Sequence, residues 1–231
     1  SKLTEITEGA VGFISNGVAT SQSDYLDAGT SSDFTVGSSG NFTVECFIYP
    51  TSVTDTSVFG IGASSQLSYR IINGAPYMYV GGSGGVLNTG TIPKDKWTHI
   101  AVTRSGGTLY SFIDGVLADS VANTSSISAS GGTGEGFFIG AANLSAASPP
   151  QYGFTGQISN FRFINGTALY TSDFSVPTSK LTNVTNTKLL CCQSNTEPAS
   201  AAVAPNVTGV NSGVQWSAGA GPNFESVNPA R

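Results

Sequence analysis

Residues 97–118 read WTHIAVTRSGGTLYSFIDGVLA and predict two β-strands, together with the turn that leads into a third. Over residues 97–104 the side chains alternate, so that odd positions face one way and even positions the other. Ser-Gly-Gly at 105–107 turns the chain, and TLYSFI runs back to Asp114-Gly115. This dipeptide readily adopts the two positive φ angles that a type I′ hairpin needs. The stretch therefore predicts consecutive antiparallel hairpins.

Two further segments continue this pattern: SDYLDAGTSSDFTVGSSGNFTVECFIYP (23–50) and GFTGQISNFRFINGTALYTSDFSVPTSKLTNVTNTKLLCCQS (153–194). Together with 97–118 they resemble the laminin-G-like branch of the concanavalin A-like lectin/glucanase superfamily, over residues 20–194. The resemblance implies an all-β fold, in which two antiparallel sheets form a jelly-roll β-sandwich with almost no helix. The core F-x-G-x-I-S-N-x-R and the following NGTALYTSDFSVP are similar to copies in virion proteins of tailed, especially marine, bacteriophages.

Composition agrees with one large all-β domain of 231 residues. Charged residues make up 10% of the chain and the net charge is −5, which does not favour a nucleic-acid surface with its clustered Lys and Arg. No apolar run approaches the roughly 20 residues of a membrane span. The first residues, SKLTEITEGAVGF, lack the basic start and apolar stretch of a signal peptide. We therefore expect assembly in a host cytoplasm and localisation in the virion.

Three segments are predicted along the chain. Residues 1–20 form a lead-in with one strand near 10–14, residues 21–194 form the sandwich, and residues 195–231 form an extended tail. The tail carries Trp216 and Phe224, whose large apolar side chains are costly to leave in water. They are predicted to anchor the tail on a surface, either of its own domain or of a neighbour, and the neighbour is favoured. A short helical turn is expected near 167–172.

The cysteines do not predict a disulfide framework. Cys191 and Cys192 are adjacent, and Cys46 lies in the middle of a predicted strand, where it is expected to be a small buried residue. Three free thiols are predicted, with a Cys46–Cys191 or Cys46–Cys192 bridge as the alternative. There is no C-x-x-C pattern and only one histidine, so zinc ligation is not indicated.

No catalytic pattern is found. Retaining glycosidases need two carboxyls about 5–5.5 Å apart, and the superfamily's laminarinase-type enzymes carry them as E-x-D-x-E or E-x-D-x-x-E, which this sequence lacks. The resemblance implies structural roles for Glu45 and for His99, the latter as a packing residue. Arg104 is expected in an ion pair at the rim, and Asp114 in a turn. We predict that the protein is not an enzyme.

Two ligand classes are considered. Calcium is the superfamily's frequent ligand, held by Asp and Asn oxygens, but no dense carboxylate cluster is present, so no cofactor is predicted and calcium stays an alternative. Its candidate ligands are Asp24, Asp27, Asp33, Asp55 and Asp173, of which Asp27 and Asp33 are expected to cap turns. For glycans, Tyr77 and Tyr79 share one strand face, and Tyr69 is placed near them across a hairpin. The other interpretation is that these rings complete the core or an intersubunit contact.

Two functional hypotheses follow. The first is a non-catalytic structural component of a bacteriophage virion that acts through contacts with other virion proteins. It would be a capsid decoration or knob, or a fibre-associated subunit. Such a subunit is expected to be a homo-oligomer or bound to the capsid or tail. The alternative is a carbohydrate-binding receptor-recognition module, or adhesin, on the virion that binds host surface glycans. Glycoside hydrolysis ranks last. No nucleic acid and no membrane insertion are expected.

Overall fold

The computed structural model describes residues 9–13, 24–63, 66–130, 135–143, 150–194, 196–197, 199–204, 207–210 and 215–217. Over these ranges the chain forms sixteen strands and a single 3-10 turn at Ser32–Phe34, and every described strand pair is antiparallel. The predicted all-β jelly-roll sandwich is confirmed, whereas the helical turn expected near 167–172 does not form. None of the described segments is a helix long and apolar enough to cross a bilayer.

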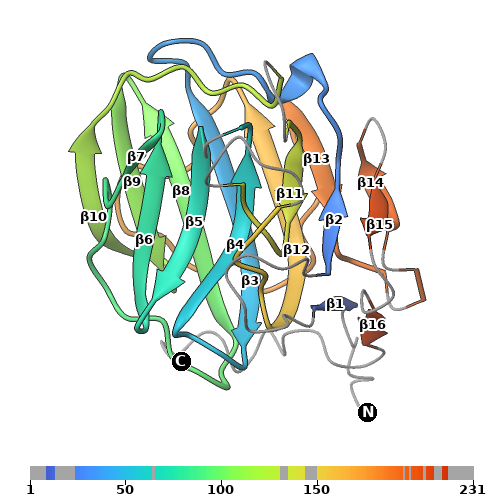
Figure 1. The fold of residues 1–231 in the computed structure, drawn as a ribbon. Helices are drawn as coiled ribbons and strands as arrows, with labels where there is room; N and C mark the ends of the chain where they lie inside the picture. The colour runs from blue at the N-terminus through green and yellow to red at the C-terminus, as the bar shows by residue number, and fades with distance from the viewer. Residues whose placement is uncertain are drawn as a thin grey trace, which may run out of the picture.

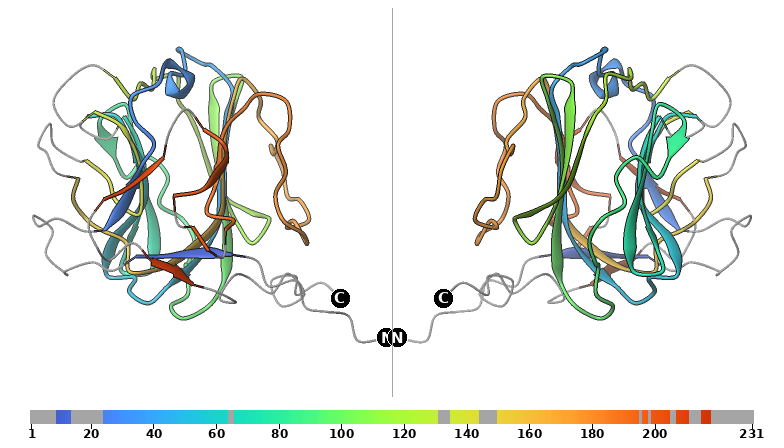
Figure 2. Two further views of the ribbon diagram at one scale, coloured as in Figure 1. Left: turned by 90° about the vertical axis from the view of Figure 1, so that its right-hand side faces the viewer. Right: turned by 90° about the vertical axis from the view of Figure 1, so that its left-hand side faces the viewer.

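Two sheets face each other and enclose the core (Figure 1, Figure 2). The nine-stranded sheet runs in the order β10 (Val116–Ala122), β9 (Thr108–Ile113), β8 (Thr98–Ser105), β3 (Phe42–Pro50), β12 (Gly156–Asn165), β1 (Ala10–Phe13) and β16 (Gln215–Ser217), with β13 (Thr187–Cys191) beside β12 and β14 (Ala201–Val203) beside β13. The seven-stranded sheet runs in the order β15 (Thr208–Val210), β2 (Tyr25–Asp27), β11 (Phe137–Ile139), β4 (Asp55–Ile61), β5 (Leu67–Ile72), β6 (Ala75–Val80) and β7 (Ser83–Gly84).

The hairpins around β9 form as the sequence predicts. Asp114 and Gly115 have φ angles of 48° and 77°, which are the positive values of a type I′ turn. The register pairs Val116 with Ile113 on one side of β9 and Ile100 with Ile113 on the other. Val116–Ala122 thus becomes the edge strand of the nine-stranded sheet.

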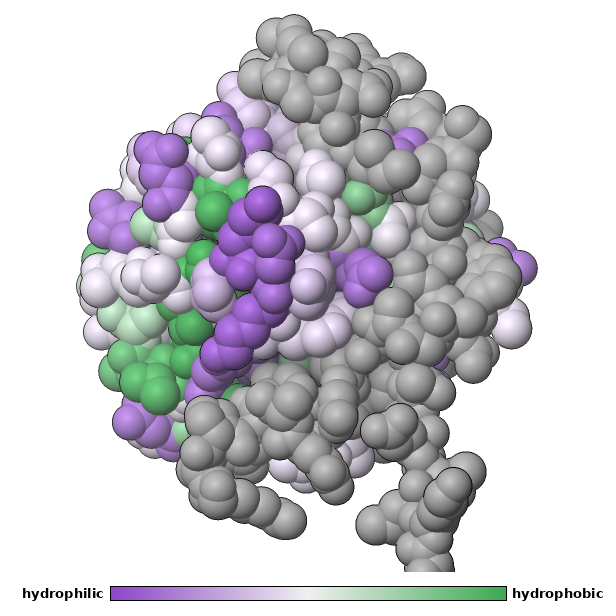
Figure 3. All heavy atoms as spheres, turned by 90° about the horizontal axis from the view of Figure 1, so that it is seen from below, coloured by the Kyte–Doolittle hydropathy of each residue, from purple (hydrophilic) through white to green (hydrophobic). Residues whose placement is uncertain are grey.

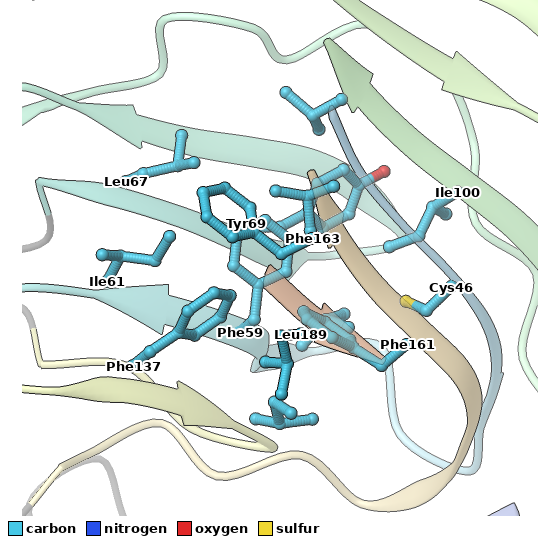
Figure 4. Close-up of a cluster of buried hydrophobic side chains, with 14 of the residues drawn as sticks. Cys46, Phe59, Ile61, Leu67, Tyr69, Ile100, Phe137, Phe161, Phe163 and Leu189 are labelled. Atoms are coloured by element: carbon cyan, nitrogen blue, oxygen red, sulfur yellow. The ribbon is translucent and has the colours of Figure 1, made fainter. Parts of the chain in front are cut away.

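Aromatic rings from both sheets meet in the core (Figure 4). Phe137 from the seven-stranded sheet lies edge-on to Phe161 and Phe163 of β12, with ring centroids 5.7 and 5.5 Å apart. Phe34 packs against Phe137 at 5.0 Å in the same edge-on manner. Such edge-to-face pairs add to the stabilisation from burial itself. Cys46 points into this core and is fully buried, as expected.

Arg104 was expected at the rim in an ion pair, and this prediction is wrong. Its side chain is fully buried at the end of β8. The guanidinium donates to three backbone carbonyls, those of Gly37, Gly40 and Ser125. Burial lowers the pKa of Arg104 from its usual value. Because a guanidinium carries five fixed donors, it can satisfy several loop carbonyls at once and needs no carboxylate partner.

A long connection between β12 and β13, which we call the strap (residues 166–186), covers the outer face of the nine-stranded sheet (Figure 2). Thr43 in β3 donates to the carbonyl of Thr167 and accepts from the backbone N–H of Leu169. Thr103 in β8 donates to the carbonyl of Tyr170. Hydroxyls of the sheet therefore satisfy backbone groups of a segment that has no strand partners of its own.

Described strands from the predicted lead-in and from the predicted tail both join the sandwich. β1, in the predicted lead-in, pairs with β12 and with β16. The tail, predicted to be extended, contributes β14 beside β13, β15 beside β2, and β16 beside β1. The preference for docking the tail on a neighbour is therefore wrong for the described part of it. The free edges of β1, β2 and β13 provide unpaired backbone groups that the tail satisfies.

Candidate functional site

Tyr77 and Tyr79 lie on the outer face of the seven-stranded sheet. Residues along β6 alternate, so that Pro76, Met78 and Val80 are buried while Ala75 and the two tyrosines are half-buried. The two tyrosine rings are 5.6 Å apart between centroids and tilted by 57°. The predicted pairing of these rings on one strand face is therefore observed.

Glycines opposite these rings leave room for them. Gly84 in β7 pairs with Tyr79, and a Cβ there would come within 2.8 Å of the Tyr79 ring. A Cβ at Gly85 would come within 3.2 Å of the Tyr77 hydroxyl. Gly84 and Gly85 therefore leave room for the two rings, because a side chain at either position would displace them.

Tyr69 does not belong to this surface, and its inclusion was wrong. It pairs with Met78 across the β5–β6 hairpin and is fully buried. Its ring packs against Phe59 with centroids 6.2 Å apart (Figure 4). Directly opposed residues share a face of the sheet, so the partner of a core methionine also faces the core. The sequence contained this signal: an Asn73-Gly74 turn pairs position 69 with 78.

The same register places Arg70 beside Tyr77 and Tyr79. This position of Arg70 was not predicted from the sequence. Arg70 pairs with Tyr77, and its side chain is 5% exposed. The guanidinium carbon lies 3.9 Å from the centroid of the Tyr152 ring and 5.7 Å from that of Tyr79. One guanidinium nitrogen forms an ion pair with Asp55. The loop that carries Tyr152 is held to β4, since the Ser57 N–H donates to the Tyr152 carbonyl at 2.7 Å.

Asp55 is the exposed member of this ion pair. Its side chain is 42% exposed, whereas that of Arg70 is 5% exposed. Asp55 begins β4 and pairs with Ile72, at the same end of the sheet as the hairpin turn. We call Asp55, Arg70, Tyr77, Tyr79 and Tyr152 the outer-face cluster. It combines aromatic rings with an oriented carboxylate, and such a surface can pack against an apolar ring face while accepting hydroxyl hydrogen bonds.

A second polar cluster is buried on the other sheet, under the strap. Glu45 in β3 accepts from Arg162 at one oxygen, and the Tyr170 hydroxyl donates to the other at 3.0 Å. The His99 Nε2 lies 3.2 Å from that second oxygen. Glu45, which the sequence showed as a lone carboxylate, therefore joins β3, β8, β12 and the strap.

This buried network is closed to substrates. The side chains of Glu45 and His99 are 0% exposed. Burial favours the neutral acid, but the hydrogen bond and charge of His99 and the charge of Arg162 outweigh it, so the pKa of Glu45 lies below its usual value. The ring of Phe174 lies edge-to-face with His99, with centroids 5.8 Å apart, and stacks on Tyr170 at 3.6 Å. The structural and packing roles expected for Glu45 and His99 agree with this geometry.

The calcium candidates are dispersed and mostly occupied. Asp27 accepts from the Gly29 N–H, as expected for a turn residue, and burial raises its pKa. Asp33 forms an ion pair with Lys188 at 2.8 Å, and Asp173 accepts from the Leu117 N–H at 2.8 Å. Asp24 is buried, and Asp55 pairs with Arg70. Across the described ranges, no group of three His, Cys, Asp or Glu residues is placed to hold a metal ion.

The remaining candidates are the thiols and the tail aromatics. Cys46, Cys191 and Cys192 are free and buried, so neither bridge to Cys46 forms. Of the predicted tail anchors, Trp216 has a described backbone that pairs with Val11. Its side chain and all of Phe224 lie outside the described residues.

Large hydrophobic side chains are exposed at a few places in the described part of the chain. Val116 is 58% exposed and Leu117 37%, both at the start of edge strand β10. Seen from below (Figure 3), hydrophobic and hydrophilic residues lie side by side on the described part of the surface.

Residues 20–175 match the family model described as the concanavalin A-like lectin/glucanases superfamily. The chain belongs to this superfamily. No curated protein matches the sequence.

Among solved structures, a protein of Bacteroides ovatus, whose name provisionally assigns it carbohydrate binding, is 15% identical with a TM-score of 0.63. The match covers 92% of this chain and 60% of that protein. The heptameric SAP-like pentraxin of Limulus polyphemus is 17% identical with a TM-score of 0.54, covering 73% of this chain and 80% of the pentraxin chain. This member of the superfamily shares its fold with both proteins.

Proposed function

We propose that this lectin-like domain binds glycans through the outer-face cluster and does not cleave them. The observation that carries the proposal is the half-exposed pair Tyr77 and Tyr79, 5.6 Å apart, beside the exposed carboxylate of Asp55. Aromatic rings present an apolar surface to the C–H face of a sugar ring, and a nearby carboxylate accepts from its hydroxyls. The provisional carbohydrate-binding name of the Bacteroides ovatus protein supports the proposal.

The absence of turnover is part of the proposal. Glu45 is fully buried, and its two oxygens are engaged by Arg162, His99 and Tyr170. A carboxyl in this state can neither protonate a leaving group nor attack an anomeric carbon. Incubation with laminarin, agar and bacterial polysaccharides should release no reducing ends.

Glycan binding is tested with an oligosaccharide array followed by calorimetry on the ligands that bind. Tyr77→Ala and Tyr79→Ala should each weaken binding by about tenfold or more, which is the loss expected from removing a central aromatic contact. Tyr110→Ala is the matched control, because Tyr110 is a half-buried tyrosine of β9 in the other sheet. Equal effects of all three variants, or no binding by the wild type, would contradict the proposal.

A virion role is a second proposal, supported by the resemblance of GFTGQISNFRFINGTALYTSDFSVP (153–177) to segments of phage virion proteins. It is compatible with glycan recognition by the same domain, in the manner of an adhesin. In the structure this segment forms β12 and the start of the strap. Immunogold labelling of purified phage particles with an antibody to the domain would place it on the capsid or tail, and unlabelled particles would refute the role.

A further inference from the structure

The guanidinium of Arg70 has no accessible edge for a ligand, since its Nε is buried, although it has no hydrogen-bond partner among the described residues. It is stacked on Tyr152, paired with Asp55, and lies 3.4 Å from the Tyr79 hydroxyl, and its side chain is 5% exposed. Ligand carboxylates and sulfates are bound through an accessible, often bidentate, guanidinium edge. The cation of the outer-face cluster is therefore not available to an acidic sugar.

The carboxylate of Asp55 is, in contrast, held ready for a ligand. Arg70 binds its Oδ1, while no residue of the described part of the chain donates to Oδ2. Because the Asp55 side chain is 42% exposed, its Oδ2 can accept hydroxyl hydrogen bonds without breaking the ion pair. The pair with Arg70 fixes the direction of the carboxylate, which lowers the conformational cost of binding.

We infer that the cluster selects neutral, hydroxyl-bearing glycans over acidic ones, with Asp55 as the residue that determines this specificity and Arg70 as its positioning residue. The inference rests on the proposed glycan-binding function. A neutral sugar donates hydroxyls to Asp55 and packs on Tyr77 and Tyr79. A uronic acid or sulfated sugar instead brings a second negative charge to an exposed carboxylate, on a protein whose net charge is −5.

The test compares matched ligands on the wild-type protein. Gluco-, manno- and galacto-oligosaccharides are each assayed by calorimetry beside the 6-carboxyl (uronic acid) oligosaccharide of the same linkage. At least one neutral ligand should bind, and its acidic counterpart should bind at least about tenfold more weakly. Raising the salt concentration should leave neutral binding unchanged, because screening acts on charged partners.

Asp55→Asn should weaken neutral binding by about tenfold, the effect of losing a charge-assisted acceptor. It should also reduce the difference in affinity between the neutral ligand and its acidic counterpart, because the repelling charge is gone and Arg70 loses its partner. Asp119→Asn is the control: it makes the same change of charge on β10, where Asp119 accepts from the Asn88 and Thr89 N–H groups. An improvement in acidic binding cannot arise from misfolding.

The outcomes separate the two proposals. If acidic ligands bind more tightly than neutral ones and Tyr77→Ala abolishes that binding, the glycan site stands and the inference about its specificity is wrong. If no ligand of either kind binds, the proposed function fails and the inference fails with it. If Asp55→Asn does not fold, the comparison of matched ligands on the wild type still decides.

Discussion

At the scale of single residues, the Glu45 network is a buried charge with partners from several elements. The Glu45 carboxylate is not exposed to solvent, so its charge is stabilised instead by Arg162 and by hydrogen-bond donors of His99 and Tyr170. Burial, followed by the charge of Glu45, raises the pKa of Tyr170 well above its usual range, which keeps its hydroxyl protonated as a donor. Losing the charge of Glu45 would leave Arg162 buried without its ionic partner.

We therefore predict that Glu45→Gln lowers the free energy of unfolding by about 3 kcal/mol at pH 7, the cost of breaking a buried ion pair. The folded-state pKa of Glu45 is depressed, so its stabilisation is fully present above the unfolded value near 4.3 and is lost as pH falls through the lower folded value. Urea unfolding should thus show the variant approaching the wild type in strong acid. Tyr170→Phe, which removes one hydrogen bond, should cost only about 1 kcal/mol; equal losses for both variants would contradict the ionic role.

At the scale of elements, the β9–β10 turn and the strap depend on each other. The Phe174 N–H donates to the Gly115 carbonyl at 2.9 Å. A Cβ on Gly115 would come within 2.2 Å of the Phe174 carbonyl oxygen. Gly115 thus serves both the positive φ of the turn and the close approach of the strap, which in turn covers the Glu45 network.

Gly115→Ala should accordingly destabilise the domain by clearly more than Gly106→Ala. Both positions have positive φ, 77° and 56°, so both substitutions carry a backbone cost of about 1 kcal/mol. A Cβ on Gly106 meets nothing within 4 Å, so this variant measures the backbone cost alone. The difference between the two unfolding free energies reports the contact with the strap, and similar values would show that the strap moves aside at no cost.

At the scale of the whole molecule, the described strands of the tail extend both sheets. β15 extends the seven-stranded sheet, whereas β14 and β16 extend the nine-stranded sheet at two different edges. Figure 1 shows these three strands grouped on the side away from β10. The tail therefore covers backbone edges that would otherwise be free to pair with other chains.

Deleting residues 195–231 should lower the melting temperature of the isolated domain by at least about 4 °C. For a domain of this size, this corresponds to a loss of roughly 1–2 kcal/mol in the free energy of unfolding. Truncation after Ser217 removes no described strand and is the control. Differential scanning calorimetry of the two truncated proteins measures the effect. If both melt like the full chain, the three strands contribute little, and a function of the tail elsewhere becomes the better explanation.

Local sequence determined the strands and turns, because alternation and Gly-containing turns act within a few residues. The hairpins at 97–118, the buried Cys46 and the pair Tyr77 and Tyr79 follow from it. The register of the hairpin at Asn73-Gly74 also determines the faces on which Tyr69 and Arg70 lie.

The contacts between distant segments were decided by the tertiary structure alone. Glu45 meets Tyr170 across 125 positions, and Arg104 reaches carbonyls 64 and 67 positions away. The pairing of the tail strands with β1, β2 and β13 is of the same kind. The physical reason is that a buried charge or a free strand edge requires partners, but its own neighbourhood in the sequence does not specify which of many equivalent backbone groups will supply them.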